Sequence, residues 1–272
     1  MKRIIETFIT YKYILVRDIN WGVIIIKDHI NSSEETTNRL QSSYNELQAL
    51  NATISHEIKA PVRAIDGYAR IFLEDYGDSI DNEGTDLILN IRTICSDTLT
   101  LINKLLDYTH FAEAEPIQEA IDLSLMIKDV FNELTLRYCD NKAIKLNMDK
   151  DIPFILADKI LIKQVLINII SNSLKFTSNK EVSVITIGYE FKNDENIFYI
   201  KDNGVGFDMK FSENLFGMFQ RMHSIDDFEG SGVGLAIVKK IIQKFGGKVW
   251  ITGEVGKGAC VYFTIAPQYI LK

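Results

Sequence analysis

Apolar residues in the first third of the chain recur at alternating steps of four and three, which is the spacing of a helical heptad. This first seam consists of Leu40, Tyr44, Leu47, Asn51, Ile54, Ile58, Pro61, Ile65, Tyr68 and Phe72. After a turn-rich segment over residues 76–84, a second seam consists of Leu87, Ile91, Ile94, Thr98, Leu101, Leu105 and Tyr108. Extra apolar positions make the second stripe wider than one partner helix can cover. We therefore predict an α-helical hairpin that pairs with a second copy as a dimeric four-helix bundle.

Beyond residue 116, short apolar runs of strand length alternate with helical stretches. The predicted order is a strand near 120–123, a helix over 124–140, a strand near 144–148, a helix from Asp158, strands at 182–191 and 197–201, a long loop, a helix over 232–245 and a final hairpin. This order favours an α+β sandwich with helices on one face of a sheet.

These patterns predict a multidomain chain. Residues 31–112 would form the coiled-coil linker and helical hairpin, 113–118 a linker, and 119–272 the α+β domain. Residues 1–30 are too short for a core of their own. Their apolar run at residues 22–26, followed by charged sequence, resembles the last strand and exit of a PAS-type sensor. A plain N-terminal extension is the alternative.

Composition narrows the possible partners. The chain has 272 residues and a formal net charge of -7, and it shows no basic run, which argues against a nucleic-acid partner. Its longest apolar stretch near the N-terminus is far too short to cross a bilayer, so we expect no membrane segment within this chain. Cys95, Cys139 and Cys260 lie far apart and fit neither a disulfide framework nor a metal site. Reduced thiols suit a cytoplasmic protein, or the cytoplasmic part of a membrane-bound sensor.

His56 is the first candidate for chemistry. If Ile54 and Ile58 lie in the seam, His56 lies on the opposite, solvent-facing side of the helix. An exposed helical histidine is usually a bystander, but the sequence from Ile54 to Pro61 resembles the phosphoacceptor box of histidine kinases. The resemblance implies that His56 attacks the γ-phosphate of ATP, while Glu57 acts as a general base or orients the second ring proton.

A polar stripe on an otherwise apolar helix is the second candidate. Gln164, Asn168, Asn172 and Lys175 are spaced by four, four and three residues and share one face. Asparagine is a poor helix former, so we interpret this stripe as the lining of a pocket. The segment resembles the N box of histidine kinases and related ATPases. That implies Asn172 as a Mg2+ ligand, Asn168 and Lys175 near the phosphates, and Phe176 in the nucleotide site.

Two glycine motifs follow. Asp202, Gly204 and Gly206 come after a predicted strand and would by themselves indicate a tight turn. In the family that the chain resembles, Asp202 accepts a hydrogen bond from the adenine amino group. The second motif opens a helix, whose free N–H groups can hold phosphates, and it comprises Gly230, Ser231, Gly232, Gly234 and Leu235. A dinucleotide-binding loop fits poorly, because no apolar strand precedes these glycines.

The loop between the glycine motifs is unusually apolar and resembles the nucleotide lid of phytochrome-like histidine kinases, with Arg221 able to reach phosphate. Residues 256–259 are similar to the last glycine motif of the same family. Together these motifs resemble a sensor histidine kinase over residues 31–266, with a HisKA-type dimerisation domain and a Bergerat or GHKL-type ATP-binding domain.

The resemblance implies a homodimer that uses ATP and Mg2+ to phosphorylate His56 and then passes the phosphoryl group to an aspartate of a response regulator. A GHKL-fold ATPase that drives clamp closure is an alternative. A dimeric scaffold that binds nucleotide without catalysis is another.

Overall fold

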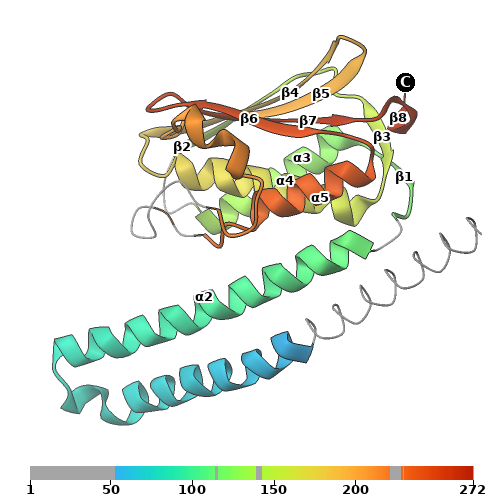
Figure 1. Cartoon of the computed structure of the whole chain (residues 1–272). Coiled ribbons are helices and arrows are strands. Elements are labelled where there is room, and N and C mark those ends of the chain that lie inside the picture. Colours follow the sequence, from blue (N-terminus) through green and yellow to red (C-terminus); the bar gives the residue numbers. More distant parts are fainter. Residues whose placement is uncertain (1–52, 114–115, 139–142, 221–227, 229, 272) are drawn as a thin grey trace, which may run out of the picture. The chain divides into compact units, whose positions relative to one another are not determined.

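The computed structural model describes residues 53–113, 116–138, 143–220, 228 and 230–271 (Figure 1). Three predictions lie outside the described residues. They are the sensory remnant at residues 1–30, the part of the first heptad seam before residue 53, and the phosphate contact of Arg221.

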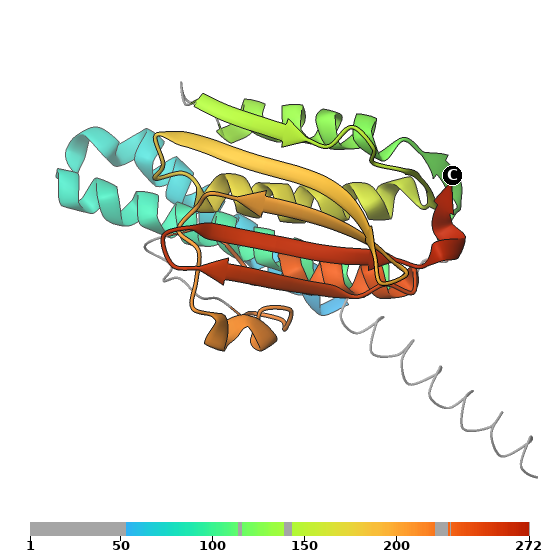
Figure 2. The same cartoon turned by 90° about the horizontal axis from the view of Figure 1, so that it is seen from above.

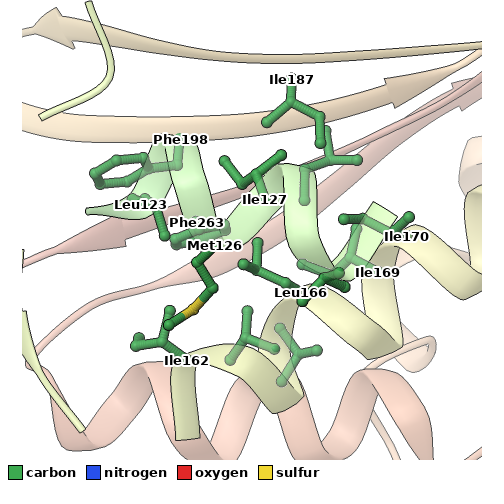
Figure 3. Close-up of a cluster of buried hydrophobic side chains, with 14 of the residues drawn as sticks. Leu123, Met126, Ile127, Ile162, Leu166, Ile169, Ile170, Ile187, Phe198 and Phe263 are labelled. Carbon is green, nitrogen blue, oxygen red and sulfur yellow. The ribbon is translucent and has the colours of Figure 1, made fainter. Parts of the chain in front are cut away.

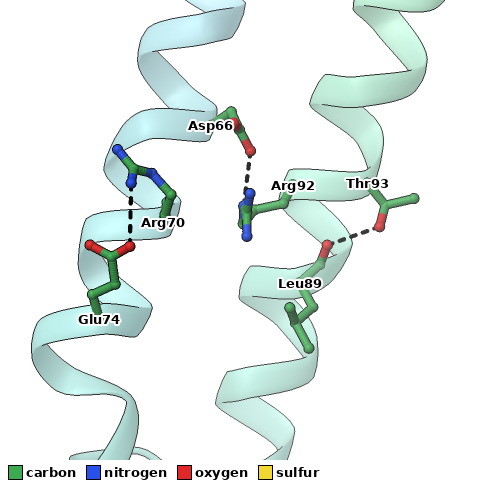
Figure 4. Close-up of polar contacts among 6 residues, drawn as sticks. All are labelled: Asp66, Arg70, Glu74, Leu89, Arg92 and Thr93. Atoms are coloured by element: carbon green, nitrogen blue, oxygen red, sulfur yellow. Dashed lines mark hydrogen bonds and ion pairs between the residues drawn. The ribbon is translucent and has the colours of Figure 1, made fainter.

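The N-terminal described segment is a helical hairpin. A helix over residues 53–76 is followed by the 3-10 turn η1 (Gly77–Ser79) and by α2 (Asn82–Glu113). Asp81 caps α2, because its Oδ1 accepts a hydrogen bond from the N–H of Gly84 at 2.8 Å. Between the helices, Arg92 Nε donates to Asp66 Oδ1 at 2.9 Å (Figure 4). The turn therefore lies where the sequence predicts it.

The heptad seams of this hairpin remain open to solvent in a single chain. The exposed fraction is 49% for Ile65 and 74% for Tyr68 on the first helix, and 60% for Leu87 and 64% for Ile94 on α2. A stripe of large apolar side chains with this exposure is typical of a surface that another helix covers.

Residues 116–138, 143–220, 228 and 230–271 form an α+β domain. Its elements are β1 (Glu119–Ile121), α3 (Leu123–Tyr138), β2 (Ala143–Met148), β3 (Phe154–Ala157), α4 (Lys159–Phe176), β4 (Val182–Lys192), β5 (Glu195–Asp202), η2 (Met209–Asn214), α5 (Gly234–Lys244), β6 (Val249–Glu254), β7 (Gly258–Ile265), η3 (Pro267–Tyr269) and β8 (Ile270–Leu271). The larger sheet has the order β2-β4-β5-β7-β6, with β2 parallel to β4 and the other pairs antiparallel. A smaller sheet has the order β1-β3-β8.

Helices α3, α4 and α5 cover one face of the larger sheet (Figure 2). Burial alternates along β5, where Phe198 and Ile200 are buried while Tyr199 and Lys201 lie on the other face. The core fills the layer between helices and sheet (Figure 3) and includes Leu123, Met126, Ile127, Ile162, Leu166, Ile169, Ile170, Ile187, Phe198 and Phe263. The predicted sandwich with helices on one face is confirmed.

Two short strands, β3 and β8, escape prediction. They pair with each other through Phe154 opposite Leu271 and Ile155 opposite Ile270. Partners so far apart in sequence leave no local pattern, and two to four residues are too few to show a period. The predicted helices over 124–140 and 232–245 correspond to α3 and α5, with ends that differ by one or two residues.

Asp158 is the N-cap of α4, where the helix was predicted to start, and it also connects the helix to the segment before β1. Its Oδ1 accepts hydrogen bonds from the N–H of Ile160 at 2.9 Å and of Leu161 at 3.1 Å, and its Oδ2 accepts one from the N–H of Ile117 at 3.0 Å. We expect Asp158→Ala to lower the free energy of unfolding by about 1–2 kcal/mol, measured by urea denaturation. Asp151→Ala, at an exposed position, is the matched control. Equal losses in both variants would contradict the capping role.

Candidate active site

One pocket of the α+β domain collects residues from motifs that lie far apart in the sequence. The predicted site residues in its lining are Asn168, Asn172, Lys175, Phe176, Asp202, Gly206, Gly230, Ser231, Gly232, Gly234 and Leu235. They come from α4, the end of β5 and the start of α5. The fold thus brings three residues of the polar stripe and residues of both glycine motifs to one cavity.

Helix α4 contributes three residues of its polar stripe, Asn168, Asn172 and Lys175, to the lining of this pocket. The buried apolar side chains of the same helix belong to the core. Asn168 is 8% exposed, and its Nδ2 donates to the carbonyl of Gln164 at 2.9 Å. A Cβ atom at Gly234 would lie 2.9 Å from Asn168 Oδ1, so the glycine lets α5 begin close beside α4. Lys175 reaches the glycine loop, because its Nζ lies 3.0 Å from where a Cβ of Gly230 would be.

Asp202 is the buried acid of the pocket and is 7% exposed. Its Oδ1 accepts hydrogen bonds from the N–H of Gly204 at 2.9 Å and of Ala259 at 3.1 Å. Burial raises the pKa of Asp202, while hydrogen bonds from these two amides and from the Ser173 side chain act in the opposite direction. Gly204 lies outside the pocket lining and acts on Asp202 instead.

The loop after Asp202 is held against the β6–β7 turn. Gly206 has a φ of +62°, and a Cβ there would collide with the carbonyl of Glu254. Only glycine suits both the left-handed conformation and this close approach. The N–H of Gly256 donates to the carbonyl of Val205 at 2.6 Å. We call these contacts, together with the Ala259 hydrogen bond to Asp202, the loop clasp.

The second glycine motif leads into α5 and offers the free N–H groups of a helix start. Gly232 has a φ of +69°, which favours glycine at the bend before the helix. Ser231 Oγ is buried and, within the described part of the chain, has no hydrogen-bond partner. This hydroxyl can donate to a group that enters the pocket, whose lining includes Ser231. The positive end of the helix favours an anion.

An aromatic pair borders the pocket where the long loop returns to the domain. Phe176, at the end of α4, contacts Phe228 edge to face, with ring centroids 5.2 Å apart. The Nζ of Lys175 lies 4.1 Å from the centroid of the Phe176 ring. Phe228 was not assigned a role from sequence, and neither were the lining residues Ile169, Ile251 and Val261. In sequence, such apolar residues look like any other core residue.

His56 and Glu57 lie on the helix over residues 53–76, and both are exposed. An imidazole in this position can act as a nucleophile toward a partner that approaches from solvent. Within the described ranges, no group of three or more His, Cys, Asp or Glu side chains could hold a metal ion. The same part of the chain contains no helix long and apolar enough to cross a membrane.

Two family models match the chain. Residues 46–113 match the His Kinase A (phospho-acceptor) domain, and residues 157–269 match the histidine kinase-, DNA gyrase B- and HSP90-like ATPase. Both matches agree with the helical hairpin and the α+β domain that follows it.

Curated relatives and a solved structure agree with the family models. The chain is 32% identical over 228 residues to cyanobacterial phytochrome B of Nostoc sp., which covers 83% of this chain and 30% of the relative. It is 30% identical over 243 residues to the methanogenesis regulatory histidine kinase FilI of Methanothrix harundinacea, covering 83% of this chain and 26% of the relative. Full-length ShkA in complex with AMPPNP has a TM-score of 0.59 at 26% identity, covering 79% of this chain and 45% of that one. The chain thus spans less than a third of the length of these two curated relatives.

Proposed function

Because the chain belongs to the sensor histidine kinases of two-component signalling, we propose that it transfers the γ-phosphate of ATP to His56 and then to an aspartate of a response regulator. The observation that carries this proposal is the convergence of Asp202, Asn172, Lys175 and the glycine loop on one pocket. An exposed His56 supplies the acceptor.

Each part of the pocket suits one part of ATP. Asp202 would accept a hydrogen bond from the adenine amino group, and Gly206 lets the backbone approach the base. Lys175, the N–H groups that begin α5 and the buried Ser231 hydroxyl suit the phosphates. Arg221, in the loop outside the described residues, would be a further phosphate contact.

The residues present also fit a magnesium ion. Asn172 offers an amide oxygen, a hard ligand, at the polar stripe of α4. Mg2+ usually takes one or two protein ligands, with waters and phosphate oxygens completing its shell, so a site without a carboxylate cluster suits it. When bound, the ion would neutralise charge on the transferred phosphate. Glu57, next to His56, would hold or accept the second imidazole proton.

The kind of product distinguishes kinase from ATPase and scaffold. A histidine kinase incubated with γ-labelled ATP should yield protein label that is acid-labile and alkali-stable. A GHKL-type ATPase would release inorganic phosphate without labelling the protein, and a scaffold would do neither. Either of those outcomes would reject the proposal.

We further propose that the chain is a homodimer joined through the two seams of the hairpin. Ile65 lies in the seam and is 49% exposed, whereas Ile71 is 46% exposed but lies on another face of the same helix. The two sites therefore form a matched pair. We expect Ile65→Glu to weaken the dimer by about 2 kcal/mol or more, because it buries a charge in an apolar seam, while Ile71→Glu should leave the dimer intact.

Sedimentation of the whole chain over a range of concentrations tests this prediction. A monomeric wild type, or equal dissociation of both variants, would contradict the proposal that the seams form the dimer interface.

We propose the cytoplasm as the compartment, where ATP and response regulators are present. Cys95 and Cys260 are buried as free thiols, which suits a reducing environment.

A further inference from the structure

Strand β5 leaves its neighbour β4 before β4 reaches its own first residues. The last pair that joins the two strands is Asp202 opposite Ile185, and in this register residues 182–184 of β4 have no partner on β5. The backbone after Asp202 turns toward α4 instead, where the N–H of Val205 donates to the carbonyl of Phe176 at 3.1 Å. The start of β4 is thus left without a backbone partner from β5.

The side chain of Asn203 takes the place of that partner. Its Oδ1 accepts a hydrogen bond from the N–H of Val184 at 2.9 Å, and its Nδ2 donates to the carbonyl of Val182 at 3.0 Å. A carboxamide carries a donor and an acceptor in one plane, as a peptide group does. It can therefore satisfy the backbone groups of β4 while its own backbone turns away from the sheet.

These two hydrogen bonds hold the loop directly beside the buried acid. Asn203 lies between Asp202 and Gly204, and the N–H of Gly204 donates to Asp202 Oδ1 at 2.9 Å. On its other side the loop packs on α4, because a Cβ atom at Gly204 would lie 2.5 Å from the carbonyl oxygen of Phe176. Asn203 is not among the described residues that line the pocket, so it would act through its neighbours and not by touching a ligand.

We propose that Asn203 is a positioning residue for the nucleotide pocket. Its amide holds the loop on β4, and this fixes the carboxylate of Asp202 and the backbone of Gly206 where the base would lie. The inference rests on the proposed binding of ATP in this pocket. The groups that suit the phosphates belong to α4 and to the start of α5, not to this loop. Loss of the amide should therefore weaken binding of ATP and spare transfer from bound ATP.

The test is the initial rate of autophosphorylation of the whole chain as a function of ATP concentration, together with a direct titration with ATP. We expect Asn203→Ala to raise both the half-saturating concentration and the dissociation constant of ATP by about tenfold, since two hydrogen bonds that order the loop are lost. The rate at saturating ATP should stay within about twofold of the wild type. A variant that merely had fewer folded molecules would instead lose rate at saturation and keep the half-saturating concentration, and this result would overturn the inference.

Hydrogen–deuterium exchange of the backbone amides gives a second readout. In Asn203→Ala the N–H of Val184 loses its acceptor and should exchange faster. If Asn203 positions the acid, the N–H of Gly204 should also exchange faster, because its acceptor on Asp202 is no longer held in place. Faster exchange at Val184 alone would mean that the amide only closes the sheet, and the inference would be wrong.

Asn147→Ala is the matched control. Asn147 lies on β2, and its Nδ2 donates to Thr186 Oγ1 on β4 at 3.5 Å, so this variant also removes an amide that joins a neighbouring segment to β4. Asn147 lies outside the pocket lining among the described residues. Its variant should keep the half-saturating concentration of the wild type. If the Asn147 and Asn203 variants have equal values, the inference fails.

Asn203→Asp decides the question if the alanine variant does not fold. The carboxylate keeps the size of the side chain and an acceptor for the N–H of Val184, but it has no proton for the carbonyl of Val182. The half-saturating concentration of ATP should rise in this variant too, and an unchanged value would refute the positioning role. A wild type that does not bind ATP would instead reject the proposed function.

Discussion

Replacing His56 by alanine is expected to abolish phosphoprotein formation and to leave the affinity for ATP close to that of the wild type. His56 is the phosphoacceptor that we propose, at an exposed position on the hairpin, whereas the predicted site residues in the pocket come from the α+β domain. Removing the imidazole therefore removes the proposed acceptor and leaves the residues of the nucleotide pocket unchanged. The measurement is label from γ-labelled ATP on the purified protein, together with a direct titration with ATP.

His110→Ala is the matched control, because His110 is a second exposed histidine of the same hairpin. It should be labelled like the wild type. Acid-labile label that persists in the His56 variant, or that disappears in the His110 variant, would show that the acceptor has been assigned to the wrong residue.

Asn172→Ala is expected to lower the rate of autophosphorylation by about a hundredfold or more, and the deficit should shrink as Mg2+ is raised. The amide oxygen is the ligand that we propose for the ion, and its loss weakens the metal rather than the fold. Asn172 lies in the pocket, away from the buried core of α4. The unfolding transition should therefore stay within about 0.5 kcal/mol of the wild type.

Gln164→Ala serves as the control for this prediction. Gln164 belongs to the same polar stripe of α4 but lies two turns earlier, outside the pocket lining. Its backbone carbonyl, which accepts from Asn168, remains after the substitution. If the two variants autophosphorylate at the same rate at limiting Mg2+, Asn172 is not a ligand of the ion.

The long helices and strands were predictable because their patterns are local. The heptad spacing of apolar residues predicted both hairpin helices, and the turn-rich segment predicted the connection between them. Asp158 marked the start of α4. The ion pair between Asp66 and Arg92 was not predicted, since a charge on a helix does not reveal which helix faces it. The pairing of β3 with β8 was not predicted either, because the two strands are far apart in the sequence and neither shows which strand it faces.

The candidate site was predictable as motifs, but its working contacts were not. Asp202 and the glycines stand out in sequence because they are grouped in closely spaced motifs after a strand and before a helix. Phe228 does not stand out, since its place in the pocket depends on the contact with Phe176 that the fold creates. Ala259 contributes through its backbone N–H, which any residue except proline could supply, so its side chain carries no signal.

The loop clasp affects how the protein acquires its site as it leaves the ribosome. Among the described residues, strand β6 lies at the edge of the larger sheet and pairs with β7, which in turn pairs with β5. A nascent chain that ends before residue 259 lacks the amide that donates to Asp202, and its β6 has no strand to pair with. Domains fold as units when their last contacts become available. We expect a stalled nascent chain to gain nucleotide binding only after β7 has left the exit tunnel.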